Sequence, residues 1–194
     1  MKTIKIKLTG TSPILLACDR LSDPLDKATI EHKKLTGVKK KTEDVHIAIA
    51  KSQYINGLYY SDENGVHMPS VNVKKALEEG AKLSRNGDKV RKAVMILEDE
   101  IPMEYGKKLT PEQLWNDGGF LDKRSVVVSR ARVMCYRPKF PKWSLSFDVA
   151  YDEGVIHKDD ILDYFNQAGA YIGLGGFRPA KNGVFGRFQA EVLS

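Results

Sequence analysis

Two segments in the second half of the chain have the strongest β-strand pattern in the sequence. Residues 143–151, WSLSFDVAY, alternate large apolar side chains such as Trp143, Leu145 and Phe147 with polar or small ones. Residues 125–136, SVVVSRARVMCY, are rich in β-branched residues and alternate in the same way. A period of two is typical of strands with one buried face. Because only six residues separate the two segments, we expect them to pair as a long antiparallel hairpin.

Three further strands are predicted from shorter patterns. Residues 4–8, IKIKL, place isoleucine and leucine on one face and lysine on the other. The last residues of the chain, around 188–192, alternate in the same way and predict a closing strand. Residues 58–69 contain the turn-forming DENG between two short β-prone runs, which predicts a hairpin.

Two helices are predicted from the period of 3.6 residues. The first runs over residues 70–83, with Ser70 placed to cap it. The second starts at Asp159 or Asp160, where the helix dipole favours acidic side chains. Its apolar stripe consists of Ile161, Leu162, Phe165, Ala168 and Ile172.

The rest of the chain carries weaker signals. Residues 18–43 are rich in Asp, Lys and Thr and are expected to form a mobile or projecting loop, followed by a short helix at 45–52. Residues 89–103 fit a helix, a strand or one of each. Proline and glycine in residues 106–122 predict a surface connection with one helical turn at 111–115.

This order of elements predicts an α+β fold. We expect a ferredoxin-like or RRM-type antiparallel sheet with two helices, plus an inserted loop and β-hairpin. A single domain over residues 1–194 is expected, with insertions at about 18–65 and 100–142. The alternative is an α/β parallel sheet, against which the predicted hairpin of 125–151 argues.

Composition and cysteine spacing exclude several classes of protein. The chain has 194 residues, with 31 Lys and Arg against 25 Asp and Glu, a net charge of +6. It has no run of eighteen apolar residues and starts with alternating Lys and Ile, so a membrane span and secretion are not expected. Cys18 and Cys135 lie far apart and outside any CxxC spacing, which argues against a disulfide scaffold and a zinc site. We expect a cytoplasmic protein without metal or cofactor.

The glycine-rich segment 169–188, GAYIGLGGFRPAKNGVFGRF, is the most informative motif. It follows a predicted helix and precedes a predicted strand, whereas phosphate-binding loops of nucleotide-binding folds follow a strand and open a helix. Its glycines alternate with cations and flat aromatic rings, a composition that favours approach of a phosphodiester chain and stacking of bases. In the alternative interpretation, Gly173 ends the helix and the other glycines serve turns.

This segment and the start of the first helix resemble a known family. The order of helix, IGLGGFRPAKNGVFGRF and final strand looks like the glycine-rich loop of the RAMP superfamily, RRM-fold proteins that include CRISPR backbone subunits and RNA-processing endonucleases. Residues 66–77, VHMPSVNVKKAL, are similar to the first helix start of those backbone subunits, although Lys75 stands where glycine is usual.

The resemblance implies several properties. It implies binding of crRNA or other RNA on a ferredoxin-like core, with the insertions as projecting finger and thumb. It also implies assembly along the ligand, as a homo-oligomer or as a subunit of a ribonucleoprotein complex. The chain is short for a CRISPR backbone subunit, which leaves open a stand-alone or phage-encoded relative.

The predicted nucleic-acid contacts fall in three groups. The first lies in the glycine-rich segment and consists of Gly173, Gly175, Gly176, Arg178, Lys181, Gly183, Gly186 and Arg187. The second lies at the start of the first helix and consists of Ser70, Asn72, Lys74 and Lys75. The third belongs to the predicted hairpin, with Arg130 and Arg132 on one side of a strand, and consists of Arg130, Arg132, Tyr136, Arg137, Lys139 and Trp143.

These residues favour a non-catalytic protein that binds RNA or another single-stranded nucleic acid. One alternative is a metal-independent endoribonuclease of the CRISPR RNA-processing type, in which the resemblance selects His32 and His46. Another is a phage or host protein-interaction module that docks a basic surface on an acidic partner. The lysines between residues 27 and 41 fit a binding surface or a merely solvated face.

Overall fold

The computed structural model describes residues 1–128 and 130–193 and divides them into two compact units. Unit 1 consists of Met1–Ile14, Tyr60–Lys108 and Phe140–Ser194. Unit 2 consists of Leu15–Tyr59 and Leu109–Lys139, ranges that overlap the insertions expected at 18–65 and 100–142. The expectation of a single domain stays a prediction. The mixture of helices with an antiparallel sheet confirms the α+β class.

Unit 1 is built on a seven-stranded sheet. Its strands follow one another in the order β10 (Phe188–Leu193), β1 (Lys2–Gly10), β9 (Ser144–Tyr151), β6 (Glu100–Glu104), β4 (Gly65–Pro69) and β3 (Tyr60–Ser61), and β5 (Val94–Ile96) also pairs with β9. Strand β1 is antiparallel to both neighbours, with Ile6 opposite Phe147 and Val192. The predicted strands at both ends of the chain and the hairpin around DENG are confirmed.

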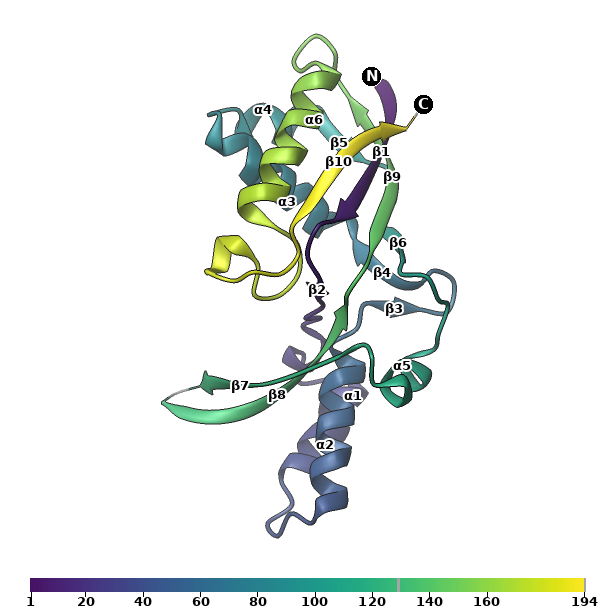
Figure 1. The fold of residues 1–194 in the computed structure, drawn as a ribbon, viewed down its shortest axis with the longest axis vertical. Helices are drawn as coiled ribbons and strands as arrows, with labels where there is room; N and C mark the ends of the chain where they lie inside the picture. The colour runs from purple at the N-terminus through teal and green to yellow at the C-terminus, as the bar shows by residue number, and fades with distance from the viewer. Residues whose placement is uncertain (129, 194) are drawn as a thin grey trace. The chain divides into compact units, whose positions relative to one another are not determined.

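Three helices of unit 1 are α3 (Ser70–Leu83), α4 (Gly87–Ala93) and α6 (Lys158–Gln167), and they lie along one face of the sheet (Figure 1). Helices α3 and α6 can approach closely because Gly80 has no side chain. A Cβ at this position would lie only 2.5 Å from the Tyr164 carbonyl oxygen. The ring of Phe165 packs against that of Phe147 with 5.8 Å between centroids, which joins α6 to the sheet. Both rings are fully buried.

Strand β10 lies at one end of the strand order, and no other described strand pairs with its outward edge. One backbone group on this edge is the Ala190 amide, which donates to the side-chain oxygen of Asn166 in α6 at 2.9 Å. The helix therefore satisfies a backbone group at the sheet edge.

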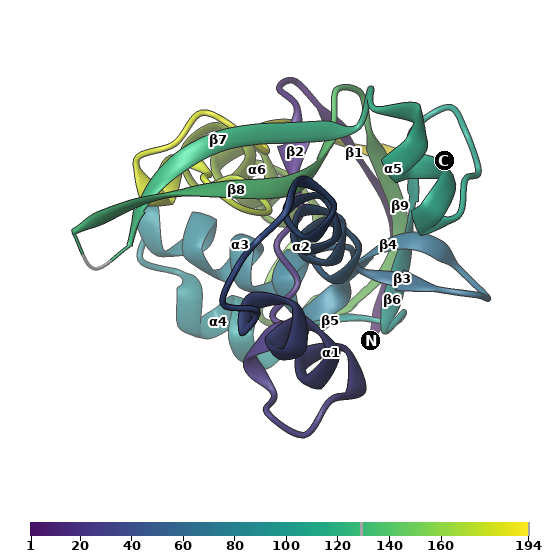
Figure 2. The ribbon, with the colours of Figure 1, turned by 90° about the horizontal axis from the view of Figure 1, so that it is seen from below.

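Unit 2 contains the helices α1 (Lys27–Thr36), α2 (Glu43–Asn56) and α5 (Pro111–Asp117) and the 3-10 turn η1 (Arg20–Ser22). It also contains most of a sheet in the order β2 (Ile14–Leu15), β8 (Ala131–Phe140) and β7 (Leu121–Val128). Figure 2 shows β7 and β8 running side by side as a long two-stranded ribbon. The helical turn expected at 111–115 is confirmed as α5, which begins with a capping box between Thr110 and Gln113.

The structure corrects the predicted pairing of 125–136 with 143–151. Residues 125–136 do not form one strand; those that the structure describes belong to β7 and β8, which pair with each other, and to the turn residue Arg130. Residues 144–151 form β9, which pairs with β1, β5 and β6. Both sides of β9 are therefore occupied by other strands, so the short connection between the segments does not join a hairpin.

Two local predictions are also wrong. The expected loop at 18–43 contains helix α1, which Asp26 caps by accepting from the Ala28 amide at 2.7 Å. This helix has few apolar residues and packs against α2 and the 3-10 turn Arg20–Ser22, where the Thr29 hydroxyl donates to the Arg20 carbonyl at 3.1 Å. Ser70 is the first residue of α3 and makes no capping bond, since Pro69 occupies the cap position.

Candidate nucleic-acid interface

The basic excess of the chain is concentrated in unit 2. This unit contains fourteen Lys and Arg and nine Asp and Glu, so it carries +5 of the net charge of +6. Unit 1 contains the other seventeen Lys and Arg and sixteen Asp and Glu. A polyanion is attracted by a local excess of charge rather than by the total, so unit 2 is the stronger candidate surface.

One face of the β7–β8 ribbon combines cations with an aromatic ring. Lys123 lies opposite Tyr136, and Val127 lies opposite Arg132. The Lys123 ammonium lies 5.6 Å from the centroid of the Tyr136 ring, within the range of a cation–π contact. Arg132 is exposed and donates to the Ser125 hydroxyl at 3.4 Å. Lys123 was not in the predicted set of nucleic-acid contacts. We add it to the candidate interface because it lies opposite Tyr136.

The other face of the ribbon contains an ion pair between two residues of β7, Arg124 and Asp122. The guanidinium of Arg124 donates two hydrogen bonds to the Asp122 carboxylate, each 2.6 Å long. This pair raises the pKa of Arg124. Asp122 is 6% exposed, so Arg124 is held to the protein rather than offered to a ligand. Arg137, opposite Asp122 on β8, has no ion pair with any described residue.

The structure places the predicted hairpin residues differently from expectation. Arg130 lies in the turn between the strands with φ of +70°, so it does not share a strand face with Arg132. Tyr136, Arg137 and Lys139 are half-buried on β8. Alternation along the strand places Arg137 and Lys139 on one face and Arg132 and Tyr136 on the other. Both faces of the ribbon therefore carry cations.

Trp143 does not belong to this ribbon. It lies in unit 1 with 3% of its side chain exposed, and its indole N–H donates to the Ser12 carbonyl at 2.9 Å. A Cβ on Gly10 would overlap the indole. Trp143 therefore packs in the core, and no base can stack on it in this structure.

The glycine-rich segment, 169–188, is folded tightly on itself. The Leu174 amide donates to the Gly186 carbonyl at 2.9 Å, and the Phe185 amide donates to the Phe177 carbonyl at 3.2 Å. A Cβ on Gly186 would overlap the Leu174 carbonyl, and a Cβ on Gly183 would overlap the Phe177 carbonyl. Both glycines are buried. They allow two stretches of backbone within the loop to touch, so these two positions do not offer open backbone to a phosphate chain.

The remaining predicted residues of this segment lie nearer the surface, except Gly173. Gly173 is buried, has φ of +73° and ends the preceding helix, as the alternative interpretation expected. Gly175 and Gly176 are half-exposed, and Lys181 is exposed. The half-buried Arg178 donates to the Gly175 carbonyl at 3.1 Å.

Arg187 is exposed and lies in an open groove of about 670 Å³ between β10 and the end of α6. Its guanidinium donates to the Ala170 carbonyl. Thr11, Asn166 and Gln189 also line this groove, so polar side chains surround the guanidinium. The groove places Arg187 where an anion can reach it.

The start of α3 has a mainly structural role. The Ser70 amide donates to the Asp99 carbonyl at 2.9 Å, and the Asn72 side chain contacts the Met68 sulfur at 3.6 Å. Lys75 is 60% exposed and lies 3.4 Å from a Glu79 carboxylate oxygen. An exposed pair of this kind contributes little to stability.

Lys74 is bound to the protein by its ammonium group. It donates to the Val90 carbonyl at 2.6 Å and to the Val94 carbonyl, at the C-terminal end of α4. Positive charge is stabilising at this end of a helix. Burial lowers the pKa of Lys74, and the nearby Glu78 carboxylate acts in the opposite direction.

We therefore expect Lys74→Met to lower the free energy of unfolding by about 1 to 2 kcal/mol, because two carbonyls lose a charged donor. The matched control is Lys75→Met, which removes the same charge from the same helix and should cost less than about 1 kcal/mol. Urea unfolding measures both. If Lys74→Met were as stable as the native protein and bound RNA more weakly, Lys74 would be a ligand contact instead.

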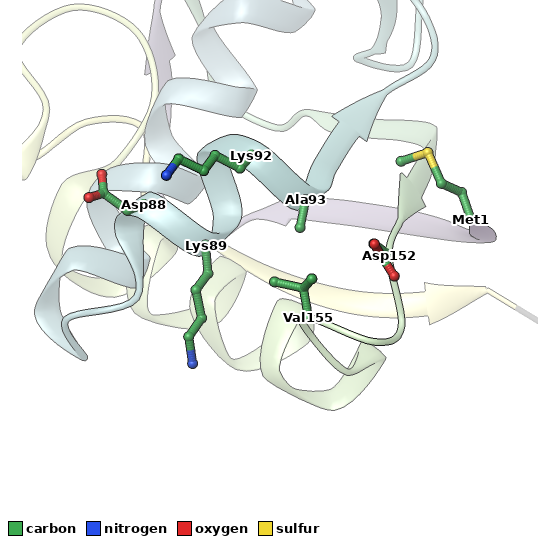
Figure 3. Close-up of a pocket in the computed structure, with 7 residues that line it drawn as sticks. All are labelled: Met1, Asp88, Lys89, Lys92, Ala93, Asp152 and Val155. Carbon is green, nitrogen blue, oxygen red and sulfur yellow. The ribbon is translucent and has the colours of Figure 1, made fainter.

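A further cavity of about 400 Å³ lies in unit 1 beside α4. Figure 3 shows Lys89 and Lys92 extending from α4 in different directions, with Ala93 and Val155 between them and Asp152. The two ammonium groups do not converge on one point, so this cavity is not built to hold a single anion. In residues 1–128 and 130–193, no cluster of three His, Cys, Asp or Glu side chains could hold a metal ion.

The two histidines of the endoribonuclease alternative lie on α1 and α2 of unit 2. A ring nitrogen of His32 lies 2.9 Å from the Ser52 hydroxyl, and burial lowers the pKa of His32. His46 is exposed. The His32–Ser52 bond joins the two helices, which is a structural contact as it stands.

Comparison with known proteins does not identify the chain. No protein-family model matches it, and no curated protein matches it either. Within the part of the chain that the structure describes, no helix has both the length and the apolar character needed to cross a membrane.

Proposed function

We propose that this protein binds single-stranded nucleic acid, RNA in the first instance, without cleaving it. The observation that carries the proposal is the β7–β8 ribbon of unit 2. This ribbon presents Lys123, Arg132 and Tyr136 on one face, Arg137 on the other and Arg130 in the turn, and none of these four cations has a carboxylate partner among the described residues. A cationic surface with an aromatic ring suits a flexible phosphodiester chain, because cations neutralise phosphates while bases stack.

The open face of the unit 1 sheet contributes little stacking to such a complex. On β1 and β9, the face opposite the helices carries Lys5 opposite Asp148 and Lys7 opposite Ser146, and these two strands place no aromatic side chain on it. Binding on the sheet in the manner of an RRM relies on aromatic residues there. The complex is therefore expected to depend mainly on charge.

The resemblance to the RAMP superfamily supports the same proposal. When β3, β4 and β6 are set aside, the order β1, α3, β5, β9, α6 and β10 is consistent with the βαββαβ order that the resemblance implies. We extend the proposal to assembly along the ligand, or within a ribonucleoprotein complex, and to a cytoplasmic location. These extensions rest on the sequence alone.

A binding titration tests the proposal. Labelled single-stranded RNA is titrated with the full chain at several salt concentrations, with EDTA present. The logarithm of the affinity should fall linearly with the logarithm of the salt concentration, by about 0.7 per phosphate neutralised. A flat dependence, or tighter binding of an acidic peptide than of RNA, would contradict the proposal.

The same mixtures separate binding from cleavage. Intact RNA after incubation is the expected result. The Ser52 hydroxyl that contacts His32 joins α1 to α2, and His67, whose ring lies 3.5 Å from the Glu100 carboxylate, is only 5% exposed. Specific cuts that disappear in His32→Ala or His46→Ala would instead establish the endoribonuclease. Parallel titrations with single-stranded DNA and with duplex RNA define the class of nucleic acid.

A further inference from the structure

Phe177 has a backbone conformation that bulky residues avoid. It lies in the glycine-rich segment between α6 and β10, with φ of +49°. In this left-handed region the Cβ of an L-residue comes close to the following carbonyl, so glycine and asparagine are the usual occupants. Gly175 and Asn182, close by in the same loop, follow that rule with φ of +74° and +55°. Phe177 is therefore a strained residue among residues that tolerate the conformation.

Contacts on both sides hold this conformation in place. The Phe177 carbonyl accepts from the Phe185 amide at 3.2 Å, and the Arg178 carbonyl accepts from the Gly183 amide at 3.0 Å. Gly183 lies so close to the Phe177 carbonyl that no Cβ fits between them. The Phe177 ring leans on the buried Phe185 ring, with 6.2 Å between centroids. The closed loop thus fixes the position from which the ring projects.

The strain does not serve burial of the ring. The Phe177 side chain is 44% exposed, whereas Phe185 and Phe188 are 8% and 3% exposed. Residues held in unfavourable backbone conformations are enriched at binding sites, where surrounding structure compensates the strain. A partly exposed ring that the loop already holds in place can stack on a planar ligand with little further loss of side-chain freedom.

The charges beside Phe177 indicate what kind of planar group it meets. Arg178 and Lys181 follow it, and neither has a carboxylate partner among the described residues. An apolar protein partner would not require these cations, whereas a nucleotide offers both a flat base and a phosphate. Arg178 is also fixed by its bond to the Gly175 carbonyl.

We propose that Phe177 stacks on a base of the bound single-stranded nucleic acid, while Lys181 and Arg178 face the adjoining phosphates. This inference rests on the proposed function and adds to it a contact in unit 1 that the predicted residue set does not contain. In this proposal the tightly folded glycine-rich loop holds the Phe177 ring in position for stacking.

The experiment compares Phe177→Ala, Phe177→Trp and the control Val184→Ala in RNA titrations. Val184 is a suitable control because it is 64% exposed on the same loop and has no aromatic face. Phe177→Ala should weaken RNA binding by about 5- to 150-fold, the range typical of losing one stacked base. Phe177→Trp should bind at least as well as the native protein, and Val184→Ala should bind unchanged. The salt slope should stay the same in all three, because no charge is removed.

Two further measurements separate stacking from folding and from charge. Phe177→Gly relieves the backbone strain, so it should be at least as stable as Phe177→Ala in urea unfolding while binding RNA equally weakly. Inorganic polyphosphate has no bases, so its affinity should be the same for Phe177→Ala and the native protein. If the native protein binds RNA with a negative salt slope and Phe177→Ala binds it equally well, the stacking contact is wrong and the proposed function stands. If the native protein does not bind RNA, both are wrong.

Discussion

Replacing Arg130, Arg132 and Arg137 together by alanine is expected to weaken binding of single-stranded RNA by roughly 100-fold or more. Each lost charge-assisted contact costs about 1.5 to 3 kcal/mol where it is direct, and less where water intervenes. The three guanidiniums lie along the β7–β8 ribbon, and none of them has a carboxylate partner among the described residues. The slope of log affinity against log salt should become shallower by about 2, since about 0.7 is lost per phosphate contact.

The control for this variant is Lys89→Ala, Lys92→Ala and Lys158→Ala combined. It removes the same net charge from exposed positions of unit 1. Long-range attraction is screened at physiological salt, so the control should weaken binding only slightly. Equal losses in both variants would show that RNA responds to total charge alone, and the ribbon would no longer be the interface. Circular dichroism and urea unfolding confirm that both variants are folded.

Gly186→Ala is expected to destabilise the protein by more than about 3 kcal/mol. Gly186 has φ of +72°, which costs alanine about 1 kcal/mol. Its missing Cβ also leaves room for the Leu174 carbonyl, which an alanine would overlap. The loop would have to open, and it would lose the hydrogen bond from the Leu174 amide to the Gly186 carbonyl.

Gly65→Ala separates the two parts of this cost. Gly65 has nearly the same backbone conformation, with φ of +64°, but nothing lies within 4 Å of its missing Cβ. Its substitution should therefore cost only about 1 kcal/mol. Urea unfolding of the two variants measures the difference, which is the energy of the close backbone approach. If both variants lost the same stability, Gly186 would serve a turn alone, and the loop would be looser than its contacts indicate.

The sequence predicted best those elements whose own pattern matches their burial. Residues 4–8 alternate because β1 is buried on one face only, and its neighbours β9 and β10 have matching patterns. Helix α3 runs from Ser70 to Leu83 as its apolar period predicted, with Val73 and Leu77 fully buried. In these elements local pattern and tertiary packing require the same residues.

Prediction failed where the chain reverses without a glycine, proline or asparagine in its sequence. Residues 125–136 alternate through the position where the chain reverses, and the turn uses Arg130 with φ of +70° in place of glycine or asparagine. Strand pairing adds to the difficulty, because β9 alternates in a way that suits any antiparallel partner. Its choice of β1 depends on the whole sheet, which a local window does not contain.

The candidate interface could be predicted by residue type but not by exposure. The sequence selected cations and aromatic residues as candidate contacts, yet it could not distinguish Trp143, which fills the core, from Tyr136, which lies on the ribbon. Lys74 and Lys75 are neighbours with the same charge. Only the structure shows that Lys74 bonds to α4 carbonyls and has a structural role, whereas Lys75 is exposed. Phe177 stands out only through its backbone angle, which its sequence neighbourhood does not reveal.

The hydrogen bond between the Ala190 amide and Asn166 affects how readily this chain aggregates through the edge of its sheet. A bare outermost strand is a template on which a second chain can extend the sheet without limit, and such growth leads to aggregates. Here the carboxamide of α6 occupies an outward donor of β10. One side chain of α6 thus makes this edge of the sheet a poorer template for the addition of a second chain.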